Sequence, residues 1–150
     1  MTSDTETIER IVDKVEFVAD ATGLLARKQS LGREEYLADR EQQAIVEREF
    51  QVAIEACIDI AELLIRDSEE EMPATNADKF HRLERLGALS TETATRMGEA
   101  AGFRNVLAHN YGGDLDDEQV YSHLQEDLRW FPIFCREVRK YLDEAATDDG

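Results

Sequence analysis

Residues that break helices or crosslink chains are scarce in this sequence. Its 150 residues include two prolines, eight glycines and two cysteines. Abundant Glu, Ala, Leu and Arg favour a mainly helical chain, and the alternating β-branched runs typical of strands are missing. A chain of this length buries about two thirds of its unfolded surface, so it needs neither disulfides nor metal to fold. We expect one domain over residues 1–150, with frayed acidic ends at about 1–4 and 146–150.

The sequence also lacks the signals of metal, cofactor and membrane binding. Cys57 and Cys135 each lie in an apolar helical pattern, with no second Cys or His at metal-ligand spacing. We interpret both as buried thiols in a reducing cytoplasm. No apolar run approaches the roughly 18 residues of a membrane span, and no basic region precedes an apolar one at the N-terminus. We therefore predict a soluble cytoplasmic protein with no metal, cofactor or membrane partner.

Positive charge is scarce as well. The formal net charge is −17, and the basic residues divide into 13 Arg and only 4 Lys. Non-specific binding of nucleic acid depends on clustered Lys and Arg, so any nucleic-acid site must be local. The acidic, lysine-poor surface fits adaptation to a salty cytoplasm, where salt screens self-repulsion, and it also fits a coding bias toward Arg.

Apolar periodicity and capping residues predict five helical segments. Residues 29–32 read as a turn and residues 68–75 as a loop, and Ser3 with Glu6 resembles a capping box for the first segment. The expected segments are about 5–27, 33–67, a short one from Thr75 or Asn76 to Gly87, one from Ser90 into residues 104–111, and one capped within Asp114–Asp117 that ends near Ala145. Pro132 should kink the last segment rather than break it, because the apolar stripe stays in phase across it.

The segment at 33–67 carries apolar residues on three sides. The three stripes are Val46, Phe50, Ala53, Cys57, Ile60 and Leu64; Ile54, Ile58, Ala61 and Ile65; and Ile45, Val52, Ala56 and Leu63. Such a helix is either central to its own bundle or covered in part by a second subunit, and we favour a homodimer. The fold class that follows is all-α, an antiparallel four-helix bundle with an additional short helix.

Glu55 and Asp59 lie four residues apart within that apolar segment, on one helical face. One interpretation is a solvated strip, which Glu62 extends by a further turn. The other is that Glu55 orients Arg104 or a neighbouring polar group in a cleft.

The stretch GFRNVLAHNYGG at residues 102–113 concentrates reactive side chains. Arg104 supplies a planar cation, His109 can transfer a proton near neutral pH, and Tyr111 offers a hydroxyl. On an ideal helix a five-residue step rotates by about 140°, so Arg104 and His109 converge only if the helix ends near Gly112 and Gly113. Asn105, four residues before His109, is better placed to bond the imidazole. His81 and His123 are expected at the surface or in packing roles.

The string RNVLAHNY, preceded by Ala-Gly-Phe, resembles the RX4HXY signature of the HepT-like branch of HEPN proteins. Those proteins are dimeric α-helical bundles with a long second helix. The sequence DREQQAIVEREFQVAIEACIDIAELLI at 39–65 resembles that second helix. The resemblance implies the toxin of a type VII-like toxin–antitoxin system, a metal-independent endoribonuclease. Arg104, His109 and Tyr111 match the three motif positions, and Asn105 matches the polar residue that commonly follows the Arg.

The implied mechanism is attack of a ribose 2′-OH on the adjacent phosphate, with His109 as acid or base and Arg104 neutralising the phosphoryl oxygens. The resemblance also implies an MntA-like minimal nucleotidyltransferase antitoxin that transfers AMP to Tyr111. An alternative is a non-catalytic helical module that binds the nucleotidyltransferase or a nucleotide. The strong negative charge favours that alternative, because no RNA-binding track is evident outside the motif.

Overall fold

The computed structural model describes residues 5–109 and 115–148, and these residues form helices and no strand. The helices are α1 (Thr5–Lys28), α2 (Arg33–Leu37), α3 (Arg40–Asp67), α4 (Asn76–Arg85), α5 (Thr91–Ala108), α6 (Asp117–Glu126) and α7 (Trp130–Asp148). The all-α bundle predicted from the sequence is confirmed. The five expected segments become seven helices because two of them are divided.

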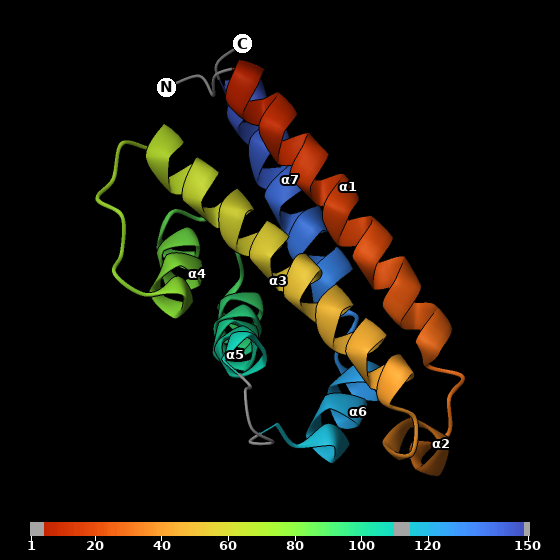
Figure 1. Cartoon of the computed structure of the whole chain (residues 1–150). Helices are drawn as coiled ribbons and strands as arrows, with labels where there is room; N and C mark the ends of the chain where they lie inside the picture. Colours follow the sequence, from red (N-terminus) through yellow and green to blue (C-terminus); the bar gives the residue numbers. More distant parts are fainter. Residues whose placement is uncertain (1–4, 110–114, 149–150) are drawn as a thin grey trace.

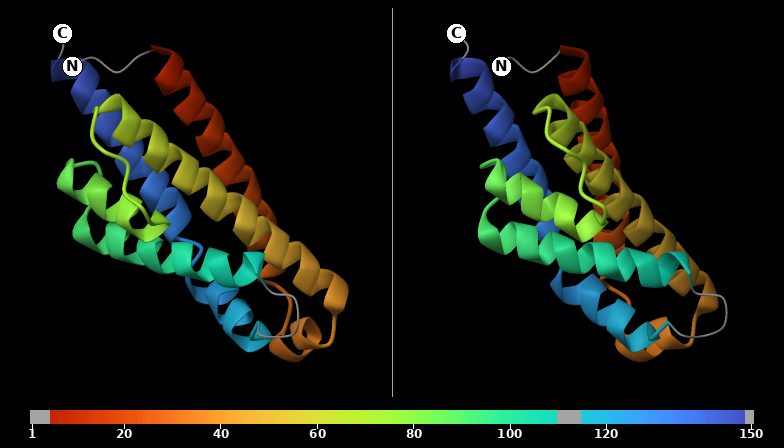
Figure 2. Two further views of the ribbon diagram at one scale, coloured as in Figure 1. Left: turned by 60° about the vertical axis from the view of Figure 1, so that its left-hand side comes forward. Right: turned by 90° about the vertical axis from the view of Figure 1, so that its left-hand side faces the viewer.

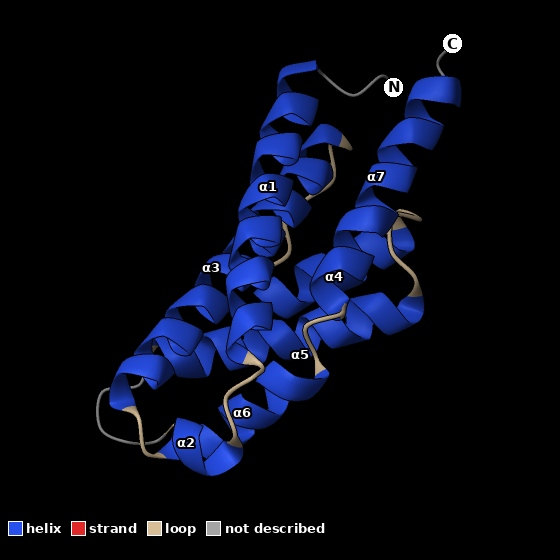
Figure 3. Cartoon of the chain, turned by 90° about the vertical axis from the view of Figure 1, so that its right-hand side faces the viewer, coloured by secondary structure: helices blue, strands red, loops and turns tan. Residues whose placement is uncertain are grey.

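Three long helices run roughly along one direction, and the shorter ones cross or close them. In Figure 1, α1 and α3 lie side by side with α7 behind them, and the start of α1 and the end of α7 lie at the same end of this layer. Figure 2 shows α4 and α5 packed together across α3. Figure 3 shows α2 and α6 closing the far end of the bundle. The C-terminal end of α5 is thereby presented beside α3 and α6.

The predicted single helix at 33–67 is wrong at its start, where Ala38 and Asp39 separate α2 from α3. The Asp39 side chain accepts hydrogen bonds from the backbone N–H groups of Glu41 and Gln42, at 3.1 and 3.2 Å. The buried Gln43 amide donates to the carbonyl oxygens of Tyr36 and Leu37, each at 3.1 Å. These bonds stabilise a local break that apolar periodicity does not reveal, because Asp39 acts as an N-cap.

The predicted continuous final helix is also wrong. Residues 127–129 separate α6 from α7, so Pro132 lies in the first turn of α7 and does not kink a longer helix. A first-turn residue has no carbonyl partner for its N–H within its own helix, and proline is tolerated there. The N-cap of α6 is Asp116, within the expected range. α7 extends to Asp148, slightly beyond the expected end.

The core lies along α3, whose first two apolar stripes are buried within the chain. The third stripe is divided, because Ala56 and Leu63 are buried whereas Ile45 is 39% exposed and Val52 is half-buried. The short α4 and its following turn match their prediction. Thr75 is the N-cap, and Gly87 adopts a φ of 86°, a left-handed conformation that favours glycine.

Within the described ranges, no helix has the length and apolar character that a membrane span requires.

Candidate functional site

The helix α5 carries the Arg and His of the 102–113 stretch, and its start is anchored to α7. Ser90 caps α5 by accepting a hydrogen bond from the Thr93 N–H at 3.2 Å. Glu137 of α7 accepts from the Ser90 N–H at 2.8 Å and from the buried Thr93 hydroxyl at 2.6 Å. Further along, the ring of Phe103 packs edge-on against Phe50 of α3, with centroids 5.4 Å apart. These contacts fix the direction in which the residues after Phe103 point.

Arg104 points from α5 toward α3 and binds Glu55. Its Nε and Nη2 atoms both donate to Oε1 of Glu55, at 3.2 and 2.8 Å. The Arg104 side chain is 27% exposed and that of Glu55 is 48% exposed, so the pair lies at the surface rather than in the core. A guanidinium has five N–H donors, and the remaining ones are available to an anion from solvent.

The acidic face of α3 combines features of both interpretations. Glu55 is exposed, as a solvated strip requires, and it also contacts Arg104, as an orienting residue requires. One turn on, Asp59 pairs with Lys14 of α1 at 3.1 Å. Glu62 pairs with Lys79 of α4 at 2.6 Å. The face is therefore an ion-paired surface, with Arg104 as its partner at Glu55.

His109 lies at the C-cap of α5, where φ is −112° and ψ is 20°. Its side chain is exposed, and its backbone N–H donates to the carbonyl oxygen of Asn105 at 3.2 Å. The helix thus ends at Ala108, four residues before Gly112, and the Arg104 guanidinium is directed at Glu55. Asn105 is exposed, and its proposed role in orienting the imidazole stays a prediction.

Four of the features expected from the sequence fall outside the described residues. They are the switch residue Tyr111, the helix-ending pair Gly112 and Gly113, the first capping position at Asp114, and the capping box that begins at Ser3.

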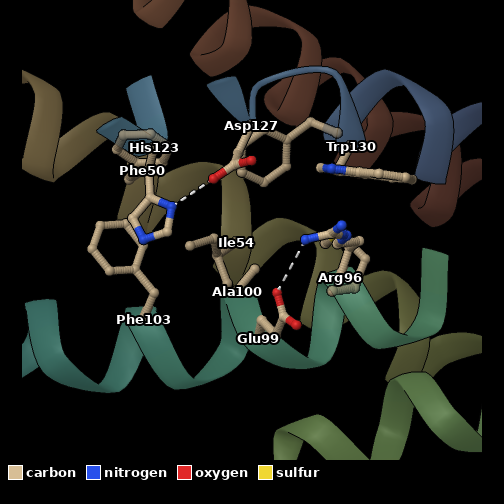
Figure 4. Close-up of a pocket in the computed structure, with 11 residues that line it drawn as sticks. Phe50, Ile54, Arg96, Glu99, Ala100, Phe103, His123, Asp127 and Trp130 are labelled. Atoms are coloured by element: carbon tan, nitrogen blue, oxygen red, sulfur yellow. Dashed lines mark hydrogen bonds and ion pairs between the residues drawn. The ribbon is translucent and has the colours of Figure 1, made fainter. Parts of the chain in front are cut away.

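A second histidine lies beside the same helix and was expected only in a surface or packing role. His123 of α6 is half-buried, and its Nδ1 atom lies 2.6 Å from Oδ2 of Asp127. Its ring packs on Phe103, with centroids 4.6 Å apart (Figure 4). The packing role is confirmed, but the paired carboxylate was missed, although a His followed four residues later by Asp could have indicated it. His81 is exposed, as expected.

The two thiols differ in burial. Cys57 is fully buried as predicted, and burial raises its pKa. Cys135 is only half-buried, which corrects the expectation of a buried thiol, and partial burial raises its pKa to about 11. Among the described residues no group of three or more His, Cys, Asp or Glu side chains could hold a metal ion.

Comparison with known proteins decides the family. Residues 5–138 match the model of the family described as Ribonuclease HepT-like. The chain belongs to the ribonuclease HepT-like family. Membership confirms both the family resemblance of residues 104–111 and the endoribonuclease class that this resemblance implied.

Relatives of this HepT-like chain share most of its length. The tRNA nuclease HepT of Aphanizomenon flos-aquae (strain 2012/KM1/D3) is 29% identical over 132 residues, which is 88% of this chain and 89% of the relative. A tri-AMPylated HEPN toxin of Shewanella oneidensis, solved in complex with MNT antitoxin, superposes with a TM-score of 0.79 at 22% identity, covering 87% of this chain and 97% of the toxin.

A cytosolic protein of unknown function from Bacillus subtilis, YutE, has the same fold as this HepT-like chain. It superposes with a TM-score of 0.80 at 15% identity, covering 96% of this chain and 94% of YutE. At this level of identity the likeness concerns the fold alone, and it extends the confirmed helical architecture over nearly the whole chain.

Proposed function

We propose that this HepT-like chain is the toxin of a toxin–antitoxin pair and cleaves RNA by attack of a ribose 2′-OH on the adjacent phosphate, without a metal ion. The observation that carries the proposal is the end of α5. There Glu55 holds Arg104 at the surface with donors to spare, five residues before an exposed His109. The relatives named as a tRNA nuclease and as a HEPN toxin support this reading.

Arg104 is the group that binds and stabilises the reacting phosphate in this mechanism. The contact with Glu55 uses one edge of the guanidinium, through Nε and Nη2. The Nη1 group can donate to a phosphoryl oxygen while that contact persists. Charge accumulates on these oxygens in the transition state, and a fixed cation there lowers the barrier. Glu55 is then a positioning residue, because it acts through Arg104.

His109 transfers the protons in this mechanism. Exposure at the C-cap of α5 leaves the imidazole accessible to an incoming strand. Cleavage needs a base for the 2′-OH and an acid for the leaving 5′-oxygen, and one imidazole cannot serve both in a single step. A homodimer would supply the second His109. The exposed Ile45 and half-buried Val52 on α3 support such a dimer, because they leave apolar surface uncovered in one chain.

Replacing His109 with Ala tests the nuclease assignment. His109 is exposed, so the variant should keep the fold and thermal stability of the parent while RNA cleavage is lost. The matched control is His81→Ala, an exposed histidine on α4, which should leave cleavage unchanged. The assay is cleavage of total tRNA by the purified proteins with chelator present. Cleavage by the His109 variant at the parent rate would end the assignment.

The neutralising partner in this proposal is an MntA-like minimal nucleotidyltransferase that transfers AMP to Tyr111. AMP adds negative charge and bulk two residues from His109, which would repel and block RNA. The AMPylated Shewanella oneidensis toxin in complex with MNT antitoxin supports this step. Mass spectrometry after incubation with the partner and ATP should locate AMP on Tyr111. An unmodified Tyr111 in an assay that consumes ATP would refute this part alone.

A second candidate is the non-catalytic module that binds the nucleotidyltransferase or a nucleotide. The net charge of −17 favours it, because RNA is repelled by most of this surface. Expression without the partner separates the two candidates. The toxin should arrest growth, and the His109→Ala variant should not, whereas a binding module should be harmless in both forms.

A further inference from the structure

A cavity lies between α5 and the α6–α7 junction, with α3 as its floor (Figure 4), and neither Arg104 nor Glu55 lines it. It encloses about 70 Å³. Its walls are aromatic, and they include the rings of Phe50, Phe103, His123, Trp130 and Phe131. The exposed side chains of Arg96 and Glu99 border it. Flat apolar walls with charged groups at the rim suit a planar ring that carries a charged substituent.

Trp130 contributes a hydrogen-bond donor with no acceptor. Its indole Nε1 atom is buried and has no hydrogen-bond partner among the described residues. Figure 4 shows this nitrogen on the side of the ring that faces Asp127 and the middle of the cavity. A buried unpaired N–H is unfavourable, so a ligand atom that reaches it when the indole shifts, and accepts from it, would bind more tightly for that reason.

Asp127 contributes an acceptor to the same cavity. Its Oδ2 atom lies 2.6 Å from Nδ1 of His123, and an ionised carboxylate requires that this nitrogen donate. The pair thus holds the carboxylate in place and leaves Oδ1 to accept a second hydrogen bond. A donor from Trp130 and an acceptor from Asp127 thus both belong to residues that line this cavity. Nucleobase edges carry the complementary pair, an acceptor next to an N–H donor.

Two arginines lie against the indole, and one of them, Arg96, also lines the cavity. The guanidinium carbon of Arg96 lies 5.6 Å from the centroid of the Trp130 ring, and that of Arg129 lies 5.3 Å from it. Arg96 pairs loosely with Glu99, at 3.7 Å, and Arg129 makes no ion pair with any described residue. In a chain of net charge −17, two arginines beside the same indole form a local positive charge that suits a phosphate group.

We propose that this cavity is a nucleotide-binding site, in which a pyrimidine base enters between Phe103 and Trp130 and its phosphate lies against Arg96 and Arg129. The small volume favours a single-ring base. A cavity of ~150 Å³ takes up a whole benzene ring. The 70 Å³ here accepts the edge of a ring, with ribose and phosphate outside, so a single-ring base brings less bulk to the mouth of the cavity than a fused purine.

The site is separate from the proposed catalytic pair. Phe103 faces the cavity, whereas the next residue, Arg104, points to Glu55 on α3. The nucleotide can therefore be a free mononucleotide, or one nucleotide of an RNA strand that extends beyond the cleavage site. Both sources present the same chemistry, and nucleotide binding does not require that the chain cleave RNA.

Trp130 is the only tryptophan of the chain, so its fluorescence reports directly on the site. Titration with UMP or CMP should change the emission saturably, with weaker responses to AMP and GMP, to uridine and to inorganic phosphate alone. Absence of a saturable change with UMP and CMP at millimolar concentration, repeated by calorimetry, would overturn the proposal. An equal response to inorganic phosphate would overturn the base contacts, and tighter binding of purines would overturn the assignment to pyrimidines.

Variants assign the contacts. The double variant Arg96→Ala and Arg129→Ala should bind UMP at least tenfold more weakly and bind uridine like the parent. The control variant is Arg136→Ala, because Arg136 is an exposed arginine of α7 outside this cavity, and it should bind UMP like the parent. Trp130→Phe keeps a ring and removes the N–H, so UMP should bind more weakly by calorimetry. Parent-like UMP binding in the double variant would overturn the phosphate contacts.

A short RNA with 2′-O-methyl groups distinguishes the two sources. If the cavity holds a nucleotide of the substrate, the double arginine variant should bind this RNA more weakly and raise the KM for cleavage. If it holds a free mononucleotide, the variant should lose the response to UMP while RNA binding stays at the parent value. If the double variant keeps both RNA binding and the response to UMP, the proposal is overturned, whether or not His109→Ala abolishes RNA cleavage.

Discussion

Glu55 gives a direct test of whether the surface ion pair on α5 positions Arg104 for chemistry. Glu55→Ala removes the oxygen that accepts from both Nε and Nη2 of Arg104. Glu55→Gln keeps an oxygen in that place and removes the negative charge. We expect RNA cleavage to fall about 10-fold to 100-fold in the Ala variant, because an unheld guanidinium no longer stays in the productive geometry. The Gln variant should retain most of the rate.

The effect on stability should be small, and this separates positioning from folding. With 48% of the Glu55 side chain exposed, solvent screens the pair, and its contribution is at most about 1 kcal/mol. For a chain of 150 residues this corresponds to a Tm lower by roughly 2–4 °C. The change in kcat should therefore be much larger than the change in folded fraction at assay temperature, which remains near one.

Asp59→Ala is the matched control. Asp59 lies one turn along the same face of α3, is 44% exposed and pairs with Lys14. Its replacement should lower Tm by a similar amount and leave cleavage unchanged. The assays are thermal unfolding followed by circular dichroism, and single-turnover cleavage that reports kcat and KM separately. Parent-like kcat in Glu55→Ala, or an equal loss of kcat in Asp59→Ala, would refute the positioning role.

Two further predictions follow from local structure. Asp39→Ala removes the N-cap of α3 and should lower the free energy of unfolding by about 1 kcal/mol, measured by urea denaturation. The control Asp13→Ala, at an exposed site of α1, should leave this free energy almost unchanged. Equal values for the two variants would show that Asp39 does not cap α3. Burial raises the pKa of Cys135 from 9.0 to about 11, so its thiol should react about a hundredfold more slowly than a free thiol at pH 8. The protonated thiol contributes to stability below pH 9, and this contribution should be lost as the pH rises toward 11. Disulfide-exchange rates between pH 8 and 11 measure the first effect, and a free-thiol rate in the folded chain would contradict it.

The sequence by itself determined the helical content, most helix boundaries and the family of this protein. Apolar residues at helical spacing, with Thr75, Ser90 and Asp116 as caps, define where most helices lie. The motif at 104–111 carries the family resemblance, because few side-chain types can neutralise a phosphate and transfer a proton. These properties depend on local spacing and on chemistry that each residue carries with it.

Tertiary structure alone decided which side chains meet. The sequence could offer Glu55 as a solvated residue or as a partner of Arg104, and only the packing of α5 across α3 brings the two within 2.8 Å. The cavity around Trp130 was not predicted for the same reason, since its walls come from α3, α5, α6 and α7. The break before α3 is different, because local hydrogen bonds of Asp39 and Gln43 form it and the apolar stripe does not reveal them.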